Sequence, residues 1–423
     1  MSNKHNKDKI ETVSKEWVDQ IRCEILPFTE RSLYEHSHFL NVERHIKALA
    51  SQRKLDENLA LCIAYFHDVS RIMEGVSGKI HSKRSAEIAK ARLKKMGMLS
   101  KHTRKVIYSA ILHHNQKSKV HGPFEELIKD ADSLAHQDEF GMSIDNEFEQ
   151  IRLDLMALDE IRFSASEESF VKTVYSNYCE HFMGLLSTPP NEMNHWVHEM
   201  RTTIRKLQAL LYFGDNKPMK KDMLLALKPI FKVLSKSRSL YVLSRSLDAF
   251  EPLSKLKISL EVALKEAHDR LIKHIKVHYT SDYVMGIEHL LSLNECHLKF
   301  DDIGLSKMIK RYFQILSFTE LDDSDALHQL RIKGKPLKYI LGSDLLKMTH
   351  PVFQETLLTL HELLGDLNDI QDRDHFFKHY KMSSDEKRFL MDQTKLQTKF
   401  LKTELKKRLF LLKKLMNLNK IIL

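Results

Sequence analysis

The chain has 423 residues, of which 42% are hydrophobic and 29% charged, and this composition predicts a folded protein of two or three domains. Only 12 Gly and 9 Pro are present, which excludes a collagen-like or low-complexity chain and argues against an all-β protein rich in tight turns. The net charge of +10 is uneven: residues 1–190 contain 27 Lys and Arg against 28 Asp and Glu, so the whole basic excess lies in residues 191–423. This asymmetry predicts a neutral domain joined to one that meets a polyanion.

Nothing in the sequence indicates a membrane or an oxidising compartment. No apolar run approaches the roughly 20 residues that span a bilayer, and residues 1–17 lack the apolar segment of a secretory signal. The cysteines form no CxxC pair, so neither a zinc ribbon nor a disulfide framework is indicated; they are Cys23, Cys62, Cys179 and Cys296. We therefore expect a reduced, cytoplasmic protein without a membrane span.

Apolar residues recur at helical spacing in both halves of the chain. Examples are residues 55–69 and 83–97 in the first half and residues 325–348 and 351–367 in the second. Residues 383–423 have the pattern of one long basic amphipathic helix or a helix pair. No segment shows the convincing alternation of a strand, so both halves are predicted to be all-α.

The two prolines near residue 190 mark the expected domain boundary, because they stop any helix there and favour an extended link. The predicted division is a polar N-terminal segment at residues 1–17, a first domain at 18–186, a linker at 187–191 and a second domain at 192–423.

An ordered set of histidines and aspartates is the sharpest pattern of the first domain. An adjacent His67-Asp68 pair at a helix end can place an imidazole and a carboxylate on one divalent metal ion. The other candidates, each on a predicted helix, are His38, His81, His113, His114 and Asp132. Arg71, one helical turn after Asp68, could neutralise phosphate charge. His36, Asp130 and His113 are alternates for His38, Asp132 and His114. The alternative interpretation is that these are scattered helix histidines without a common site, or that a decayed domain keeps only the fold.

This set resembles the HD phosphohydrolase superfamily over residues 18–140, through HxxxV at His38, the His-Asp pair and ADxL around Asp132. The resemblance implies that His38, His67, Asp68 and Asp132 are the core metal ligands. It further resembles the branch with two metals, which includes enzymes that cleave dinucleoside polyphosphates, and this maps the added ligands onto His81 and His114. The implied cofactor is one or two divalent ions of Mn, Fe, Co, Zn or Mg, with Asp68 as a bridge and with Asp68 and Arg71 as catalytic residues.

The second domain contains an internal repeat. The pattern HxxRxxxRxL, which begins at His198, returns as HxxRxxxKxL, which begins at His328, 130 residues later. Residues 234–239 correspond to residues 364–369 at the same offset. Two matches at one offset predict a duplicated helical unit, arranged as a bundle with pseudo-twofold symmetry.

Each repeat places basic side chains on one helix face, because residues at i, i+3 and i+7 lie on the same side. Two such rows favour a groove for a long polyanion, since guanidinium groups bind phosphate in bidentate fashion and lysine adds point charge. A solvated helix face is the alternative, and Pro336 is expected to kink its helix. Nucleic acid is the disfavoured polyanion because only Trp196 and Tyr339 could stack bases.

The repeat resembles the CHAD domain, a conserved-histidine α-helical domain known for binding inorganic polyphosphate, over residues 191–423. The segments VHEMRTTIRKL, LHQLRIKGKPLKY and LLGDLND carry the resemblance, and the first repeat departs from it where Ser239 and Tyr241 replace acids beside Arg238. The implied polyphosphate-binding residues are His198, Arg201, Arg205, Lys206, Arg238, His328, Arg331, Lys335 and Lys338, which Lys310 and Arg311 could extend.

The sequence therefore predicts a metal-dependent phosphohydrolase that acts on a nucleotide, a dinucleoside polyphosphate or polyphosphate, with a second domain that binds inorganic polyphosphate. The alternative is a non-catalytic polyphosphate-binding or granule-associated protein whose first domain only senses a nucleotide or serves as a scaffold. Association with polyphosphate granules in the cytoplasm is expected in either case.

Overall fold

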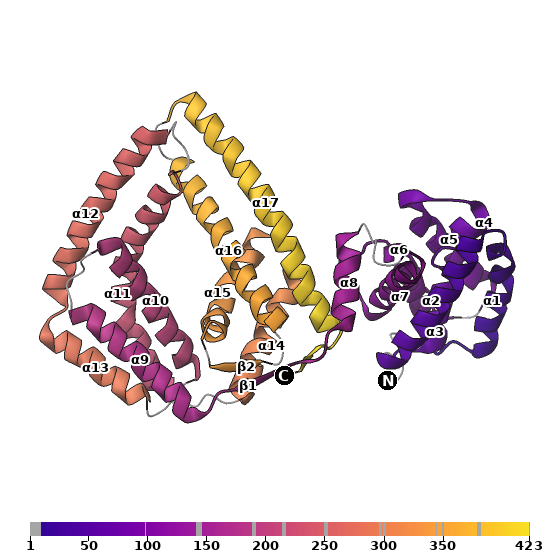
Figure 1. Cartoon of the computed structure of the whole chain (residues 1–423), viewed down its shortest axis with the longest axis horizontal. Coiled ribbons are helices and arrows are strands. Elements are labelled where there is room, and N and C mark those ends of the chain that lie inside the picture. Colours follow the sequence, from indigo (N-terminus) through magenta and orange to yellow (C-terminus); the bar gives the residue numbers. More distant parts are fainter. Residues whose placement is uncertain are drawn as a thin grey trace, which may run out of the picture. The chain divides into compact units, whose positions relative to one another are not determined.

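The computed structural model describes residues 10–422, except residues 98, 141–145, 188–191, 214–216, 249–252, 296–297, 299–301, 344, 349–350 and 379–381 (Figure 1). Two compact units make up the chain. The N-terminal unit comprises the described residues up to Asp159 together with Lys413–Lys420, and the C-terminal unit comprises the described residues from Glu160 to Leu412 and the final strand. None of the described helices is long and apolar enough to cross a membrane.

The N-terminal unit is entirely helical over its described residues. Side chains at helix starts cap several of these helices, as where Asp56 accepts a hydrogen bond from the amide of Leu59. The elements are α1 (Lys15–Thr29), α2 (Leu33–Gln52), α3 (Glu57–Phe66), α4 (Val69–Glu74), η1 (Gly78–Ile80), α5 (His81–Lys95), α6 (Lys101–His113), α7 (Pro123–Phe140) and α8 (Glu147–Ala157).

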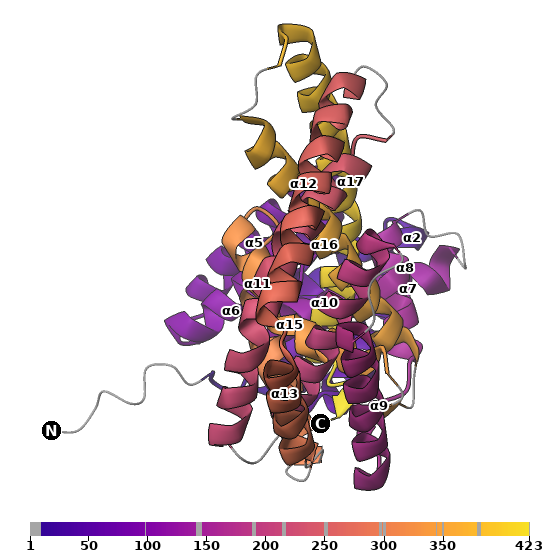
Figure 2. The same cartoon turned by 90° about the vertical axis from the view of Figure 1, so that its left-hand side faces the viewer.

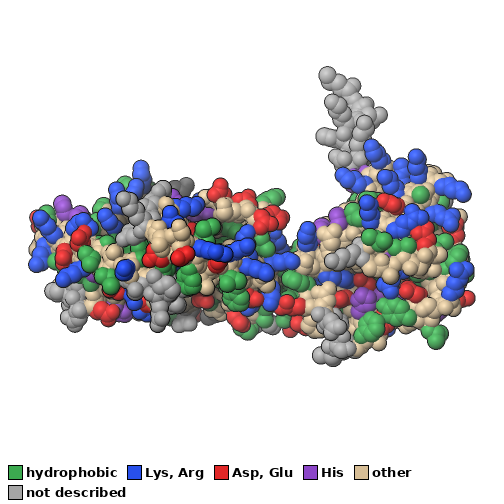
Figure 3. Space-filling view, turned by 90° about the horizontal axis from the view of Figure 1, so that it is seen from above, with side chains coloured by type: hydrophobic (Ala, Val, Ile, Leu, Met, Phe, Trp, Pro, Cys, Tyr) green, Lys and Arg blue, Asp and Glu red, His purple; other side chains and the backbone are tan. Residues whose placement is uncertain are grey.

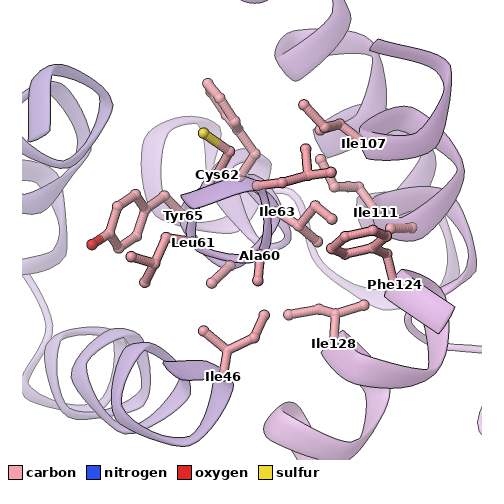
Figure 4. Packing of buried hydrophobic residues seen from close by; sticks show 14 of the residues in the cluster. Ile46, Ala60, Leu61, Cys62, Ile63, Tyr65, Ile107, Ile111, Phe124 and Ile128 are labelled. Atoms are coloured by element: carbon pink, nitrogen blue, oxygen red, sulfur yellow. The ribbon is translucent and has the colours of Figure 1, made fainter. Parts of the chain in front are cut away.

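Helix α3 is the centre of this unit, because every residue from Leu59 to Phe66 is buried. It packs against α1, α2, α5, α6 and α7. Figure 4 shows side chains of α3 surrounded by Ile46 of α2, Ile111 of α6 and Ile128 of α7. A helix that is apolar on all sides must lie in the interior, so the His-Asp pair that follows it is placed inside the protein.

The C-terminal unit is a helical bundle with three short strands among its described residues. These strands have no recognisable signal in the sequence, because they are too short to show an alternating pattern. β1 pairs antiparallel with β2 and parallel with β3. The elements are β1 (Ile161–Ala165), α9 (Glu168–Ser187), α10 (Met193–Leu210), η2 (Leu211–Phe213), α11 (Lys217–Arg245), α12 (Ser254–His278), α13 (Ser281–Glu295), α14 (Asp302–Phe318), α15 (Ser324–Leu341), β2 (Leu346–Met348), α16 (Pro351–Lys378), α17 (Ser384–Asn417) and β3 (Ile421–Ile422).

The predicted duplication is visible in the order of the helices. The series α9, α10, α11, α12 returns as α14, α15, α16, α17, and each counterpart begins about 130 residues later. Helices α10 and α15, which carry the two basic rows, pack against each other, and the view in Figure 2 also shows them together in the middle of the bundle. Helix α15 continues through Pro336 to Leu341. The all-α fold class is therefore confirmed, with a minor sheet added.

The division between the two units differs from the boundary expected from the sequence. Helix α9, which was assigned to the first domain, packs against α10 and α13 of the C-terminal unit. Most of the expected linker, residues 188–191, lies outside the described residues. Lys413–Lys420, which comprise the end of α17 and the three residues after it, belong to the N-terminal unit, although the sequence groups them with the second repeat.

Candidate metal centre and anion-binding cavity

Six predicted ligands come together in the interior of the N-terminal unit. His38 lies on α2, His67 and Asp68 lie between α3 and α4, His81 begins α5, His114 follows α6, and Asp132 lies on α7. None of the six is more than 8% exposed. Five separate parts of the chain therefore deliver polar side chains to one buried place, which is costly unless they bind a partner.

One group of donor atoms surrounds Nε2 of His38. This atom lies 3.2 Å from Oδ1 of Asp132 and 3.4 Å from Nε2 of His67. Nε2 of His67 is in turn 3.8 Å from Oδ2 of Asp68. One donor atom each from His38, His67 and Asp68 lies within 4.8 Å of the others, so these residues could share a metal ion.

A second group surrounds the other carboxylate oxygen of Asp68. Oδ1 lies 3.1 Å from Nε2 of His81 and 3.4 Å from Nε2 of His114, and these two nitrogens are 3.2 Å apart. Asp68, His81 and His114 likewise have donor atoms within 4.8 Å of one another. Asp68 presents one oxygen to each group, so its carboxylate could contribute a ligand atom to a metal site in either one.

The Nδ1 atoms of the four histidine rings, which point away from the cluster, each lie beside a hydrogen-bond acceptor. Three rings direct Nδ1 at the carbonyl oxygen three residues earlier, at 2.5–2.6 Å, and these pairs are His67 with Ala64, His81 with Gly78, and His114 with Ile111. Nδ1 of His38 lies 3.1 Å from Oε1 of Glu139. A ring that donates its Nδ1–H in this way presents an Nε2 lone pair to the centre.

These orientations fit a cation. In the tautomers that donate Nδ1–H, the Nε2 lone pairs of His38 and His67, and those of His81 and His114, face each other at 3.4 and 3.2 Å and repel. Oδ1 of Asp68 accepts no hydrogen bond of acceptable geometry although it is buried. A positive ion among these atoms removes both penalties. Imidazole and carboxylate donors suit Mn, Fe, Co or Zn, so the residues present fit the divalent metal that the sequence implied.

His67 and Asp132 have the protonation states of metal ligands, whereas the ring of His38 holds a proton. Burial opposes its charge, but hydrogen bonds to Asp132 and Glu139 raise the pKa of His38 to about 10, so a metal ion would have to displace that proton. Burial lowers the pKa of His67 to about 4, so its ring is neutral near pH 7. Burial opposes the ionisation of Asp132, but neighbouring groups, first among them Lys117, outweigh it and hold the pKa of that carboxyl well below its ordinary value. Neutral imidazole and ionised carboxylate are the forms that bind metal.

Sequence reasoning missed the residues that support Asp132. Nζ of the buried Lys117 donates to Oδ2 of Asp132 at 2.7 Å and to the carbonyl oxygen of Lys129 at 2.9 Å. His136 lies one turn further along α7, with Nε2 3.6 Å from Oδ1 of Asp132 and Nδ1 2.8 Å from Oε1 of Glu149. The spacing of His136 from Asp132, four residues on one helix, was the only signal in the sequence.

The three alternate ligands lie elsewhere. Nδ1 of His36 is hydrogen-bonded to Oγ1 of Thr29 at 2.9 Å. His113 stacks on His121 with ring centroids 4.4 Å apart. Asp130 faces away from the cluster into a network of buried ion pairs.

Arg71 lies at the edge of the cluster. Its Nη1 donates to Oδ2 of Asp68 at 2.9 Å, and its Nη2 lies 3.3 Å from Oε1 of Glu35. The guanidinium carbon is 5.9 Å from the centre of the Tyr34 ring. About a quarter of the side chain is exposed, so it connects the buried carboxylate to the surface.

In the C-terminal unit the two basic rows line one cavity of about 600 Å³. On the face drawn in Figure 3, Lys and Arg are interspersed with Asp and Glu, so this face shows no single broad basic patch. Seven predicted polyphosphate-binding residues line the cavity, namely His198, Arg201, Arg205, Arg238, Arg331, Lys335 and Lys338. The other two lie outside its lining: His328 is exposed at the start of α15, and Nζ of Lys206 lies 5.0 Å from the centre of the Tyr178 ring.

The six Arg and Lys residues of this cavity form no ion pair with any carboxylate in the described part of the chain. Arg201 and Arg205 instead place their guanidinium carbons 4.3 and 4.1 Å from the centre of the Phe231 ring. Arg201 also donates to Oγ of Ser235 at 2.6 Å. These contacts fix the two guanidinium groups in direction but leave their charge uncompensated.

The positive charges in the cavity lower the pKa of one of their own number. Burial, together with the charges of Arg331, Arg205 and Arg201, lowers the pKa of Lys335 to about 8. A bound anion would relieve this repulsion. His361 also lines the cavity and was missed in the sequence, and its ring packs so closely on Gly334 that a side chain there would collide with it.

A scan against protein-family models finds the HD domain at residues 36–136 and the CHAD domain at residues 191–377. The chain combines an HD domain with a CHAD domain. The HD match includes all six clustered ligands, and the CHAD match includes all the residues that line the cavity. Searches of curated proteins and of solved structures give no match.

These two families indicate the kind of chemistry that each part is suited to. HD domains belong to a superfamily of metal-dependent hydrolases and bind divalent metals. CHAD domains are associated with the binding of polyphosphate. The buried His and Asp cluster and the cationic cavity lie within the matched segments.

Proposed function

We propose that the HD domain is a metal-dependent phosphohydrolase whose substrate is a nucleotide, a dinucleoside polyphosphate or polyphosphate. The observation that supports it is the convergence of four histidine Nε2 atoms on the carboxylates of Asp68 and Asp132. A domain that kept only its fold would have no reason to maintain such lone pairs in contact inside the protein, because each unpaired buried polar group costs free energy.

The proposed ligands form two sets that share Asp68. His38, His67, Asp68 and Asp132 hold one ion, and Asp68, His81 and His114 hold the other. Divalent ions bound in this way supply an activated water and neutralise charge on phosphate oxygens. Arg71 binds a phosphate oxygen of the substrate, and its ion pair with Asp68 keeps the guanidinium close to the reacting group.

We propose that the CHAD domain binds inorganic polyphosphate in its cationic cavity. The six Arg and Lys residues there lack carboxylate partners, so a chain of phosphates can take their hydrogen bonds. The ring of Phe231 already carries two guanidinium groups, which leaves less of it for stacking a base. This favours polyphosphate over nucleic acid and would direct the protein to polyphosphate granules.

A substrate panel tests the enzymatic proposal. The full chain is loaded with Mn, Fe, Co, Zn or Mg and incubated with a nucleoside triphosphate, a dinucleoside tetraphosphate or long-chain polyphosphate. We expect phosphate or nucleotide release with at least one pair, loss of release in Asp68→Asn, and retention in His113→Ala, whose ring lies outside the cluster. If polyphosphate binds but no pair reacts, the non-catalytic alternative replaces this proposal.

A further inference from the structure

We propose that His136 is a seventh ligand of the metal centre and completes the coordination of the ion held by His38 and Asp132. The inference rests on the proposed metal centre and concerns a residue outside the set that the sequence indicated. One donor atom each from His38, Asp132 and His136 lies within 4.8 Å of the others. His136 lies one helical turn after Asp132, so both side chains leave the same face of α7.

The ring of His136 is oriented in the same way as the rings of the other histidines in the cluster. Nδ1 of His136 lies 2.8 Å from Oε1 of Glu149, just as Nδ1 of His38 lies 3.1 Å from Oε1 of Glu139. A carboxylate behind the ring fixes the tautomer that offers an Nε2 lone pair and makes that nitrogen a stronger donor. All five histidines of the cluster thus share one arrangement, with Nδ1 held by an acceptor and Nε2 directed inward.

Nε2 of His136 lies 3.6 Å from Oδ1 of Asp132, which is beyond the length of a hydrogen bond, and it makes no hydrogen bond within the described part of the chain. The rings of His38 and His136 are nearly parallel, with centroids 5.1 Å apart, and both could donate Nε2 to one ion.

The position of His136 gives it a distinct place among the ligands. Its side chain is 25% exposed, whereas the side chains of His38 and Asp132 are 2% and 6% exposed. It therefore lies nearer to solvent than His38 and Asp132 do.

The test is a metal titration of the full chain, made with Co(II) and Mn(II) and without substrate. Calorimetry gives the Kd of each ion, and the visible spectrum of bound Co(II) reports its ligands. We expect His136→Ala to raise the Kd of one of the two ions by about tenfold or more and to change the absorption bands of bound Co(II). Glu149→Gln should raise the same Kd by a smaller factor. His113→Ala is the matched control, because it removes a partly buried histidine from the same unit.

Each outcome decides something. An unchanged Kd and an unchanged Co(II) spectrum in His136→Ala assign the ring a structural role and overturn this inference while leaving the hydrolase proposal intact. If His136→Ala does not fold, as judged by its circular dichroism, His136→Gln replaces it, since the amide fills most of the volume and keeps a bond to Glu149. A wild-type protein that binds neither ion removes both proposals together.

Discussion

Nζ of Lys414 lies 2.6 Å from Oδ2 of Asp130, although 284 residues separate them in sequence. Both side chains are fully buried. Lys414 also pairs with Glu126, and Arg53, Lys129 and Arg152 bind the same two carboxylates. The end of α17, a helix that begins in the C-terminal unit, is thereby part of the core of the N-terminal unit.

The first prediction follows from the numbers of charges in this network. Four cations share two carboxylates, so loss of a carboxylate leaves buried positive charge, whereas loss of Lys414 leaves both carboxylates paired with arginine. We expect Asp130→Asn to lower the free energy of unfolding by about 3–5 kcal/mol and Lys414→Met to lower it by less. Urea denaturation of the two variants checks the order, and a greater loss in Lys414→Met would contradict it.

The second prediction concerns the stoichiometry of metal binding. Asp68 has an oxygen in each group of donor atoms, whereas His81 contacts only one of its oxygens. His81→Ala should therefore reduce the content from about two ions to about one, and His67→Ala with Asp68→Ala should remove both ions together with hydrolysis. Elemental analysis of protein reloaded with Mn or Fe measures this. An unchanged content in His81→Ala would return that ring to a structural role.

The sequence could predict which histidines and aspartates cluster in the interior because they lie at motifs on or next to helices. His67 and Asp68 follow a wholly apolar helix, and such a helix can only be buried. Glu139 and Glu149 could not be identified from the sequence, because they contact His38 and His136 only through tertiary packing. A carboxylate on a helix is usually solvated, and nothing in its neighbours along the chain distinguishes one that is not.

The CHAD domain shows the same limit. Helical spacing placed the basic rows on one face each, and seven of the nine residues do line the cavity. Spacing cannot tell how far along its helix a cavity extends, so His328, in the first turn of α15, was included although it is exposed. Residues 413–420 follow the second repeat in the chain, so the sequence groups them with it. Their place in the N-terminal unit depends on the buried partners of Lys414, which lie near residue 130 and cannot be identified from neighbouring residues.

The third prediction uses the two residues outside the cavity as an internal control. Arg331→Ala with Lys335→Ala should weaken the binding of long-chain polyphosphate strongly, and Arg201→Ala with Arg205→Ala should do the same to a smaller degree, because the second repeat retains the acids that the first has lost. Lys206→Ala with His328→Ala removes a similar number of basic groups and should have little effect.

The salt dependence separates a cavity from a generally basic surface. Each lost phosphate contact should reduce the slope of log K against log salt concentration by roughly 0.7, as for other flexible polyanions. Fluorescence anisotropy at several salt concentrations gives both quantities. An equal loss in the control pair, or displacement of polyphosphate by single-stranded DNA at equal charge, would show that only general attraction holds the polyanion.

The last prediction is a pH dependence of polyphosphate binding that arises from Lys335. Its pKa in the free protein is lowered to about 8 by burial and by Arg331, Arg205 and Arg201. A bound polyanion favours the ammonium form, so the pKa of Lys335 is higher in the complex. Below pH 8 the side chain is protonated in both states and affinity is at its full value. Above pH 8 binding must take up a proton, and affinity falls by up to about tenfold per pH unit.

Two other groups in the cavity titrate outside this range. Burial lowers the pKa of Arg201 only to about 10, and that of His361 falls to about 3. Lys335→Arg keeps the positive charge at all these pH values and should bind equally well at pH 7 and pH 9. Calorimetry in two buffers of different ionisation enthalpy should show an uptake of up to one proton near pH 9 in the wild type and none in the variant. The same uptake in Lys335→Arg would assign the titration to a different residue.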